Sequence, residues 1–399
     1  MTNNARYKWF KSLGSPKYVV APMVDQSDLA FRLMTRKHGA HLCYTQMLNV
    51  PTFLVCKEYR EENLQTSSLE RPLFVQIAGH NPEEMLKVGM MIQDMRNDNG
   101  EPICNAIDIN LGCPQGIARR GKYGAFLMEE LELLIEIVSL LSKKLRIPVT
   151  CKTRIYKDFD RSIKLCETLV NAGASLLTIH GRTRESKGEF TGAADWDMIR
   201  RIKEHFNDSV PIFANGGISN LEDVRKCMEY TGCDGVMSSE AILENPDVFV
   251  DYNLFLNKKD KANNIQLAEE YLDYAEKFPP RKIHIPRAHL LKILFRYVQY
   301  PGMTHHRDRL VRGNSIAELR EICANLKNEI TNYEMYDQPG LTWYTRYLDG
   351  ARLHSGDKAK VRLQDNLSPS KKIQNEEEEE GLGIFALGFG NNNNDDDDE

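Results

Sequence analysis

The chain has 399 residues, 41% hydrophobic and 27% charged, a composition typical of a globular protein that can bury a sizeable core. Its formal net charge of −5 is uneven: residues 371–399 hold ten acidic residues and two lysines and carry −8, so the other 370 residues carry +3. The nine cysteines form no Cys-x-x-Cys pair, residues 1–14 contain no apolar segment, and no apolar run of about 18 residues occurs. These features argue against a disulfide framework, a zinc ribbon, a signal peptide and a membrane span, and we expect a reducing compartment.

Between residues 18 and 250, short β-rich runs alternate with helical patterns. The expected strands are 18–24, 41–47, 73–79, 106–112, 148–154, 176–182, 211–217 and 235–239. The first helix is expected to follow Ser27 as its N-cap, and a later one to follow Asn220. Eight strands interleaved with helices predict an α/β fold, a (β/α)8 TIM barrel, with an open doubly wound sheet as the alternative.

After the barrel, the pattern becomes purely helical. We expect four regions: an N-terminal extension (1–17), the catalytic barrel (18–255), a smaller all-helical domain (256–340), and a low-complexity, acidic, disordered tail (341–399). Ser315 and Glu318 have the spacing of a capping box. Residues 281–312 hold eight Lys or Arg and one acidic residue, which makes them the most basic stretch of the chain.

In a TIM barrel, reactive groups lie where strands end at the carboxyl-terminal face. The residues at those positions include Pro22, Met23, Gln76, Asn110, Cys113, Lys152, His180, Arg182, Asn215, Gly216, Gly217 and Ser239. The glycine pair after the seventh strand favours a phosphate site over a simple turn. Lys152 fits a Schiff-base amine, a cation beside an electron-rich ring, or an ion-paired barrel lysine. His180 fits a ligand contact or a core histidine, and the whole set favours a flavin over a sugar phosphate.

Cys113 directly follows the fourth expected strand (106–112) and is itself followed at once by Pro114. A thiol that is mostly protonated at neutral pH can act as a general acid. A thiolate nucleophile would need an activating base, which the neighbouring sequence does not offer, and a small apolar residue in a turn is the third interpretation. Glycines at 112, 116, 121 and 124 would let this loop close over a substrate.

Seven motifs, in order, resemble those of the flavin-dependent tRNA-dihydrouridine synthases. They are "APMVDQSDLAFR", "LCYTQML", "VQIAGHNPE", "IDINLGCPQGIARRGKYGAFLM", "VTCKTRI", "LLTIHGRTRESKGEFTGAADW" and "FANGGI". The resemblance covers roughly residues 15–325 and is strongest to the eukaryotic class that acts on D-loop positions 16 and 17. It implies an FMN-binding barrel, a helical tRNA-binding domain, and reduction of the uridine C5=C6 bond with NADPH as reductant.

The resemblance also assigns roles to individual residues. It implies that Cys113 is the proton donor, that Asn110 contacts the uracil, and that FMN is held by Pro22, Met23, Val24, Gln76, Lys152, His180, Asn215, Gly216, Gly217, Ser239 and Glu240. The chain departs from close relatives at "MSSEA" (237–241), where they read "MSAEG", and at "YTQML" (44–48), where they read "YTPML". The first departure affects the expected phosphate contact, and the second the backbone near Gln46.

The implied substrate is a tRNA whose D-loop uridine is flipped into the pocket, recognised mainly through shape and phosphates. The expected substrate-binding residues are Asn110, Arg119, Arg120, Arg182 and Arg184 near the pocket, and Arg287, Lys292 and Arg296 in the basic stretch. We expect a monomer without a metal, in the cytoplasm or alternatively the nucleus. The rival hypotheses are an FMN barrel reductase acting on a small molecule, a tRNA-binding scaffold without redox chemistry, and a Schiff-base aldolase.

Overall fold

The computed structural model describes residues 3–188, 191–251 and 263–330, and every structural statement below concerns these ranges. Its central sheet consists of parallel strands in the order β2-β1-β9-β8-β7-β6-β5-β4, and β2 also pairs with β4, which closes the sheet into a barrel. The barrel strands are β1 (Tyr18–Val20), β2 (Leu42–Tyr44), β4 (Leu73–Ala78), β5 (Ala106–Leu111), β6 (Val149–Arg154), β7 (Leu177–His180), β8 (Ile212–Asn215) and β9 (Gly235–Ser238). A two-residue strand, β3 (Leu48–Asn49), extends the pairing of β4. The predicted eight-stranded TIM barrel is confirmed.

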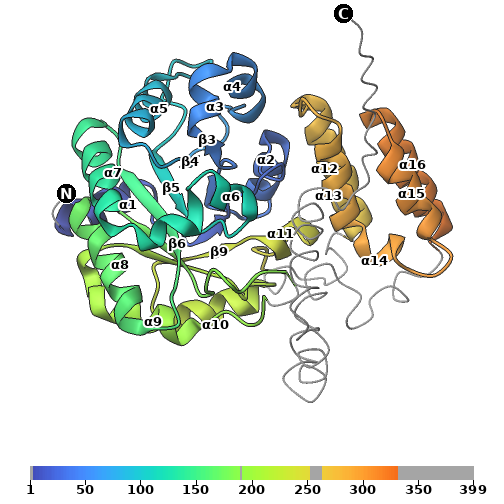
Figure 1. Ribbon diagram of the computed structural model, residues 1–399. Coiled ribbons are helices and arrows are strands. Elements are labelled where there is room, and N and C mark those ends of the chain that lie inside the picture. Colours follow the sequence, from blue (N-terminus) through green and yellow to red (C-terminus); the bar gives the residue numbers. More distant parts are fainter. Residues whose placement is uncertain (1–2, 189–190, 252–262, 331–399) are drawn as a thin grey trace, which may run out of the picture.

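Helices surround the barrel and continue into a separate group beside it (Figure 1). Those of the barrel region are α1 (Asn3–Ser12), α2 (Leu29–Lys37), α3 (Val50–Val55), α4 (Lys57–Asn63), α5 (Pro82–Asp94), α6 (Gly116–Arg120), η1 (Gly124–Glu129), α7 (Leu131–Lys144), α8 (Phe159–Ala172), α9 (Trp196–Phe206), η3 (Asn207–Ser209), α10 (Leu221–Thr231) and α11 (Glu240–Glu244). The separate group, called the helical region below, comprises α12 (Asn264–Lys277), α13 (His284–Ile293), α14 (Phe295–Val298), α15 (Thr304–Arg312) and α16 (Ile316–Glu329). None of the described helices is both long and apolar enough to cross a membrane.

The first helix of the barrel begins one residue later than predicted. Asp28, not Ser27, is the N-cap of α2, because its carboxylate accepts the Phe31 N–H. The Ser27 hydroxyl instead accepts the Met23 N–H at 2.9 Å, so it fixes the turn that follows β1. The expected cap Asn220 is confirmed at α10, and Ser315 caps α16, although the Glu318 carboxylate accepts from the Asn314 N–H rather than completing the box.

Helix α1 of the N-terminal extension packs against one end of the barrel. The Trp9 ring of α1 stacks on Phe74 at 5.7 Å, and Phe10 packs against Phe213 at 5.9 Å. Phe74 and Phe213 are each the second residue of their strand, so α1 covers the amino-terminal end of the barrel. The opposite, carboxyl-terminal end is the one available for a functional site.

The helical region is joined to the barrel by buried polar contacts as well as by apolar packing. His289 of α13 is fully buried, and its Nε2 lies 2.6 Å from Oδ1 of Asp28, the N-cap of α2. His38, at the end of α2, contacts Asp247, which follows α11, and Glu270 of α12. Burial lowers the pKa of the His38 imidazole, but the two carboxylates raise it to about 9. The helical region is therefore anchored beside the loop that follows β1. The predicted boundary at 255/256 and the predicted tail (341–399) lie outside the described residues.

Candidate active site at the barrel mouth

Strand register brings the predicted site residues to one level of the barrel. Asn110 of β5 pairs with Lys152 of β6, and His180 of β7 pairs with Asn215 of β8. These residues lie at or near the carboxyl ends of their strands, where side chains from neighbouring strands converge. The sequence prediction of a shared polar rim therefore agrees with the register.

A chain of buried hydrogen bonds crosses three strands. Asp108, fully buried, accepts from the Thr150 hydroxyl at 2.6 Å and from Gln76 Nε2 at 2.8 Å. Gln76 Oε1 in turn accepts from Asn110 Nδ2 at 2.7 Å. Asn110 Oδ1 accepts the backbone N–H groups of Gly112 and Cys113, at 3.2 and 3.0 Å. The Asp108 carboxylate thus orients the Gln76 amide, and Gln76 orients the Asn110 amide. The Asn110 amide in turn holds the loop that carries Cys113.

Burial tunes the acids of this site. It raises the pKa of the Asp108 carboxyl to about 6, although hydrogen bonds from Gln76 and Thr150 favour the ionised form. It also raises the pKa of the Cys113 thiol, an effect that the Gln115 backbone and the cations of Arg154 and Lys152 oppose only in part. Cys113 therefore keeps its proton at neutral pH, in keeping with the prediction of a general acid over a thiolate.

The cations of the site are crowded together. Burial, and next the charge of Arg154, lower the pKa of Lys152 to about 8. Burial, and next Arg182, lower the pKa of Arg154 to about 10. Burial and the same cations hold the pKa of His180 well below its usual range, so the ring is neutral. Because Arg182 Nη1 can only donate, His180 Nε2 accepts at 3.1 Å and the hydrogen lies on Nδ1. This cluster suits an anionic ligand that offers acceptors.

Arg154 also ties together the loops at the mouth. Its Nε donates to the Gly112 carbonyl at 2.7 Å and its Nη1 to the Thr183 carbonyl at 2.8 Å. The Cys113 loop is further fixed at Gly124, whose φ is +67° and where a Cβ would lie 2.6 Å from the Cys113 carbonyl oxygen. Any other residue at 124 would push this loop away from its position.

The glycine pair after β8 has backbone angles that favour glycine. Gly216 and Gly217 have φ of +105° and +76°, and Trp196 Nε1 donates to the Gly216 carbonyl at 2.9 Å. Asn215, fully buried, donates to the Met237 carbonyl and so links β8 to β9. Ser239 and Glu240 lie at the start of α11, where the Ser239 side chain makes no capping bond.

The turn after β1 carries the other expected cofactor contacts, Pro22, Met23 and Val24. Pro22 and Met23 are partly buried, whereas Val24 is 47% exposed. Gln46, which departs from the family motif, accepts the Asp25 N–H at 2.8 Å and donates to Asn63 at 2.6 Å. Gln46 therefore links the turn after β1 to the end of α4.

The predicted substrate-binding arginines do not all lie in one place. Arg182 belongs to the cation cluster and donates to the Gly192 carbonyl, and Arg119 and Arg120 are exposed in the last turn of α6. Arg184 lines a different cavity of about 330 Å³, with Met128, Tyr156, Arg161 and Glu185 among its walls.

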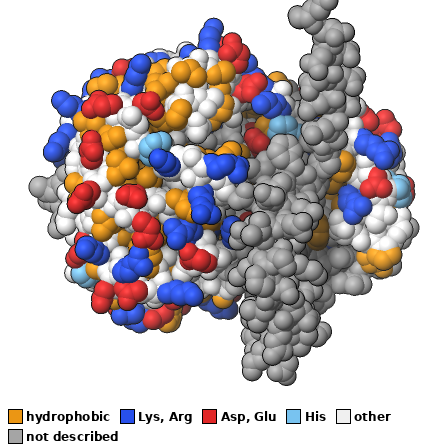
Figure 2. All heavy atoms as spheres, in the orientation of Figure 1, with side chains coloured by type: hydrophobic (Ala, Val, Ile, Leu, Met, Phe, Trp, Pro, Cys, Tyr) orange, Lys and Arg blue, Asp and Glu red, His pale blue; other side chains and the backbone are white. Residues whose placement is uncertain are grey.

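The predicted cations of the helical region are engaged in contacts near the barrel. Lys292 donates to Gln26 Oε1 at 2.6 Å, and Arg296 lies 3.9 Å from Glu244. Arg287 donates to the Val311 carbonyl within the helical region. On the face drawn in Figure 2, basic and acidic side chains are interspersed over the barrel.

Two important residues are not among those predicted from the sequence. Asp108 and Thr150 read there only as parts of buried strands, yet they form the base of the hydrogen-bond chain. A signal was present: alternation along β5 places Asp108 on the same face as Asn110, and an acid in a buried strand requires partners. Trp196, which holds Gly216, gave no comparable signal because it lies in the first turn of a surface helix.

Comparison with known proteins identifies the family. The sequence profile described as Dihydrouridine synthase (Dus) matches residues 19–333. A protein of Rattus norvegicus named tRNA-dihydrouridine(16/17) synthase, NAD(P)(+)-like, is 43% identical over 288 residues, which cover 71% of this chain and 61% of that protein. The tRNA-dihydrouridine(16/17) synthase of Saccharomyces cerevisiae is 40% identical over 75% of this chain and 69% of its own length. A tRNA-dihydrouridine(20a/20b) synthase-like protein of Mus musculus is 36% identical over 59% of this chain and 69% of its own length. The alignment with the rat protein thus spans less than two thirds of that relative. The profile match covers most of the barrel and the helical region, and it shows that the chain belongs to the dihydrouridine synthase family.

Proposed function

We propose that this chain is a tRNA-dihydrouridine synthase that uses FMN and NADPH to reduce the C5=C6 bond of a D-loop uridine, at positions 16 and 17. One observation carries the proposal: a partly buried thiol that keeps its proton lies at the barrel mouth, on a backbone segment held by the Asn110 amide. The family assignment and the printed names of the relatives support the same chemistry.

The residues at the barrel mouth fit a flavin nucleotide. Lys152, Arg154 and Arg182 place positive charge together, and the lowered pKa values of Lys152 and Arg154 mean that an anionic ligand would be favoured there. Neutral His180 has an Nδ1–H to donate, and Gln76 adds an amide. We assign cofactor contacts to these residues and to Pro22, Met23, Val24, Asn215, Gly216, Gly217, Ser239 and Glu240.

The chemistry that FMN supplies when bound, after reduction by NADPH, is transfer of a hydride to C6 of the uracil. Addition at C6 pushes the C5=C6 electron pair toward C5 and the C4 carbonyl. The Cys113 thiol then donates its proton to C5, its S–H bond breaks, and a thiolate remains that solvent reprotonates. Arg154 and Lys152 stabilise that thiolate, because their charges already favour the ionised form of Cys113.

Asn110 has two tasks in this proposal. Its Oδ1 positions the Cys113 backbone, while its Nδ2 is held toward Gln76, a proposed cofactor contact. The amide therefore connects the proton donor to the cofactor side of the site. We assign Asn110 as a contact to the uracil, which must be unstacked from the tRNA to reach this depth.

Recognition of the tRNA is assigned to basic side chains around the mouth and in the helical region. Arg182 belongs to the cation cluster at the barrel mouth, Arg119 and Arg120 are exposed on α6, and Arg184 lines the separate cavity. The others, Arg287, Lys292 and Arg296, lie on α13 and α14. Phosphate contacts of this kind make affinity fall steeply with salt.

We propose that the chain acts as a monomer.

The test is mass-spectrometric mapping of unmodified tRNA after incubation with the purified full chain, FMN and NADPH. A gain of two hydrogens at D-loop positions 16 and 17, much slower with Cys113→Ala in a single turnover, is the expected result. A gain elsewhere in the tRNA would refute the position. No gain from a yellow protein that oxidises NADPH would replace the proposal with a small-molecule reductase, and no gain from a colourless protein would replace it with a tRNA-binding scaffold.

A further inference from the structure

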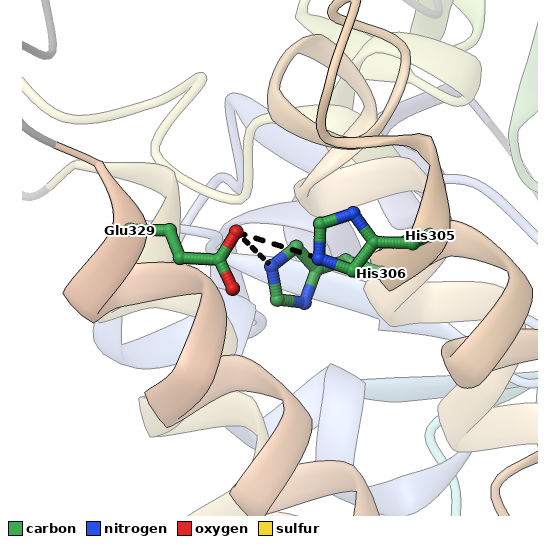
Figure 3. A group of neighbouring side chains, drawn as sticks. All are labelled: His305, His306 and Glu329. Atoms are coloured by element: carbon green, nitrogen blue, oxygen red, sulfur yellow. Dashed lines mark ion pairs between the residues drawn. The ribbon is translucent and has the colours of Figure 1, made fainter.

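Three side chains that commonly ligate metals meet in the helical region, far along the chain from the barrel mouth. His305 and His306 lie in the first turn of α15, and Glu329 is the last residue of α16. Figure 3 shows both imidazole rings beside the carboxylate of Glu329. His305 Nε2 and His306 Nε2 lie 3.4 and 3.1 Å from the same oxygen, Oε2, and the three possible ligand atoms all lie within 4.8 Å of one another.

The hydrogen positions at His305 leave a lone pair facing the carboxylate. Its Nδ1 lies 3.1 Å from the Gly302 carbonyl oxygen, which can only accept, so Nδ1 carries a hydrogen. In the neutral ring, Nε2 then directs a lone pair toward Glu329 Oε2, which is also an acceptor. Two acceptors at this distance are stabilised only by a cation between them, either a proton or a metal ion.

The second histidine, His306, is fully buried beside the same carboxylate. Its Nε2 lies 3.1 Å from Glu329 Oε2, and an imidazole nitrogen is the commonest metal ligand in proteins. Neither ring nitrogen of His306 has a hydrogen-bond partner of normal geometry, although Nε2 lies beside the Glu329 carboxylate. One proton cannot satisfy both imidazoles, whose ring centroids are 4.1 Å apart, whereas one metal ion can.

The distances suit a particular class of ion. Zinc binds imidazole nitrogen and carboxylate oxygen at about 2.0–2.2 Å in a tetrahedron, which places neighbouring ligand atoms roughly 3.3 Å apart. The two nitrogen–oxygen separations, 3.4 and 3.1 Å, match that spacing. The bond from His305 Nδ1 to a backbone carbonyl is the usual support for a metal-ligating histidine. Two nitrogens and one oxygen disfavour magnesium or calcium, which prefer oxygen ligands.

We propose that His305, His306 and Glu329 bind a zinc-class divalent cation that ties the start of α15 to the end of α16. With three protein ligands, the fourth position of the tetrahedron is open to water. Arg309, whose charge acts on His306, is paired with Glu321 at 3.3 Å, which reduces its repulsion of the ion. The site joins two helices, lies outside the proposed chemistry, and stands independently of the proposed function.

The experiment measures Zn²⁺ binding to the full chain after chelator treatment and reduction of its nine free cysteines. Because thiols also bind zinc, the result that matters is a difference between variants. The matched control is His205→Ala, which removes a surface histidine paired with one glutamate, Glu167, and no second imidazole. We expect wild type and His205→Ala to bind one more equivalent of Zn²⁺ than His305→Ala or Glu329→Gln.

The Co²⁺ absorption spectrum and the thermal midpoint test the site independently of the binding stoichiometry. His305 is half exposed, so His305→Ala leaves the core intact and its folding can be checked by circular dichroism. Co²⁺ added in place of Zn²⁺ should give a tetrahedral absorption spectrum in wild type that is weaker in Glu329→Gln. Zn²⁺ should raise the thermal midpoint of wild type and His205→Ala but not of His305→Ala. Equal stoichiometry, spectra and midpoints in all four proteins would overturn the site and leave a simple ion pair.

Discussion

The barrel mouth and the helical region are both rich in cations, but they use them differently. At the mouth, Lys152 and Arg154 end one strand, have lowered pKa values and act beside a buried hydrogen-bond chain. In the helical region, Lys292 and Arg296 reach across to barrel residues, at Gln26 and Glu244. Charge is therefore concentrated at the strand ends of the mouth, whereas a cation on a helix can serve the junction between the two regions.

The largest effect is expected from removal of the thiol that the Asn110 amide positions at the mouth. Cys113→Ala should slow single-turnover reduction of uridine by about 10²–10⁴-fold, the usual contribution of a general acid. Reduction of bound flavin by NADPH and the affinity for tRNA should stay unchanged, because no contact assigned to either one is lost. Stopped-flow absorbance separates the two half-reactions, and uridine reduction at the wild-type rate would remove the proton-donor role.

The hydrogen-bond chain below Cys113 can be tested by the pair Asp108→Leu and Asp108→Asn. Leucine leaves Gln76 Nε2 without its acceptor, which costs about 1–3 kcal/mol for a buried amide and frees Gln76 to turn away from Asn110. Asparagine keeps an acceptor for Gln76, and its NH₂ can donate to a rotated Thr150 hydroxyl. We expect roughly a 10–100-fold loss of uridine reduction for leucine and only a few-fold loss for asparagine.

Equal losses in the two Asp108 variants would mean that the negative charge, and not the hydrogen-bond chain, is what the site requires. Alkylation of Cys113 by iodoacetamide in the flavin-free protein gives a second readout. Its rate should change with Asp108→Leu, because the loop bearing the thiol loses its support at the Asn110 amide. Thr150→Ser keeps the hydroxyl and should behave as wild type in both assays.

A pH titration of flavin binding probes the crowded cations. The pKa of Lys152 is lowered from its usual value to about 8, so its positive charge is present below pH 8 and is lost as the pH rises through that value. The affinity of the apoprotein for FMN should therefore fall above pH 8, by up to about tenfold per pH unit. Fluorescence quenching of FMN measures this, and Lys152→Gln should bind more weakly at pH 7 with little dependence on pH. A wild-type affinity that is constant from pH 7 to 9 would contradict a cofactor contact for Lys152.

The barrel and its rim are predictable from sequence because parallel strands obey simple geometry. Alternation and strand ends place Asn110, Lys152 and His180 on one face, and the register of the strands brings them together. Alternation also places Asp108 on this face, but its partners Gln76 and Thr150 depend on the register of the neighbouring strands, which is a tertiary property. The partners of Lys292 and the meeting of His305 with Glu329 depend on how helices pack, which helical periodicity does not determine.

The smallest expected effects concern tRNA binding and decide what the helical cations do. Arg119→Ala at the mouth and Lys292→Met in the helical region should each weaken tRNA binding a few-fold and reduce the slope of log affinity against log salt by about one. Lys226→Met, which removes a cation paired with Glu222 on α10, is the control and should leave the slope unchanged. Lys292→Met should also lower the thermal midpoint, because its bond to Gln26 joins α13 to the turn after β1. A lower midpoint with an unchanged slope would assign Lys292 to the junction alone, and the tRNA surface would then have to be sought among other cations of the chain.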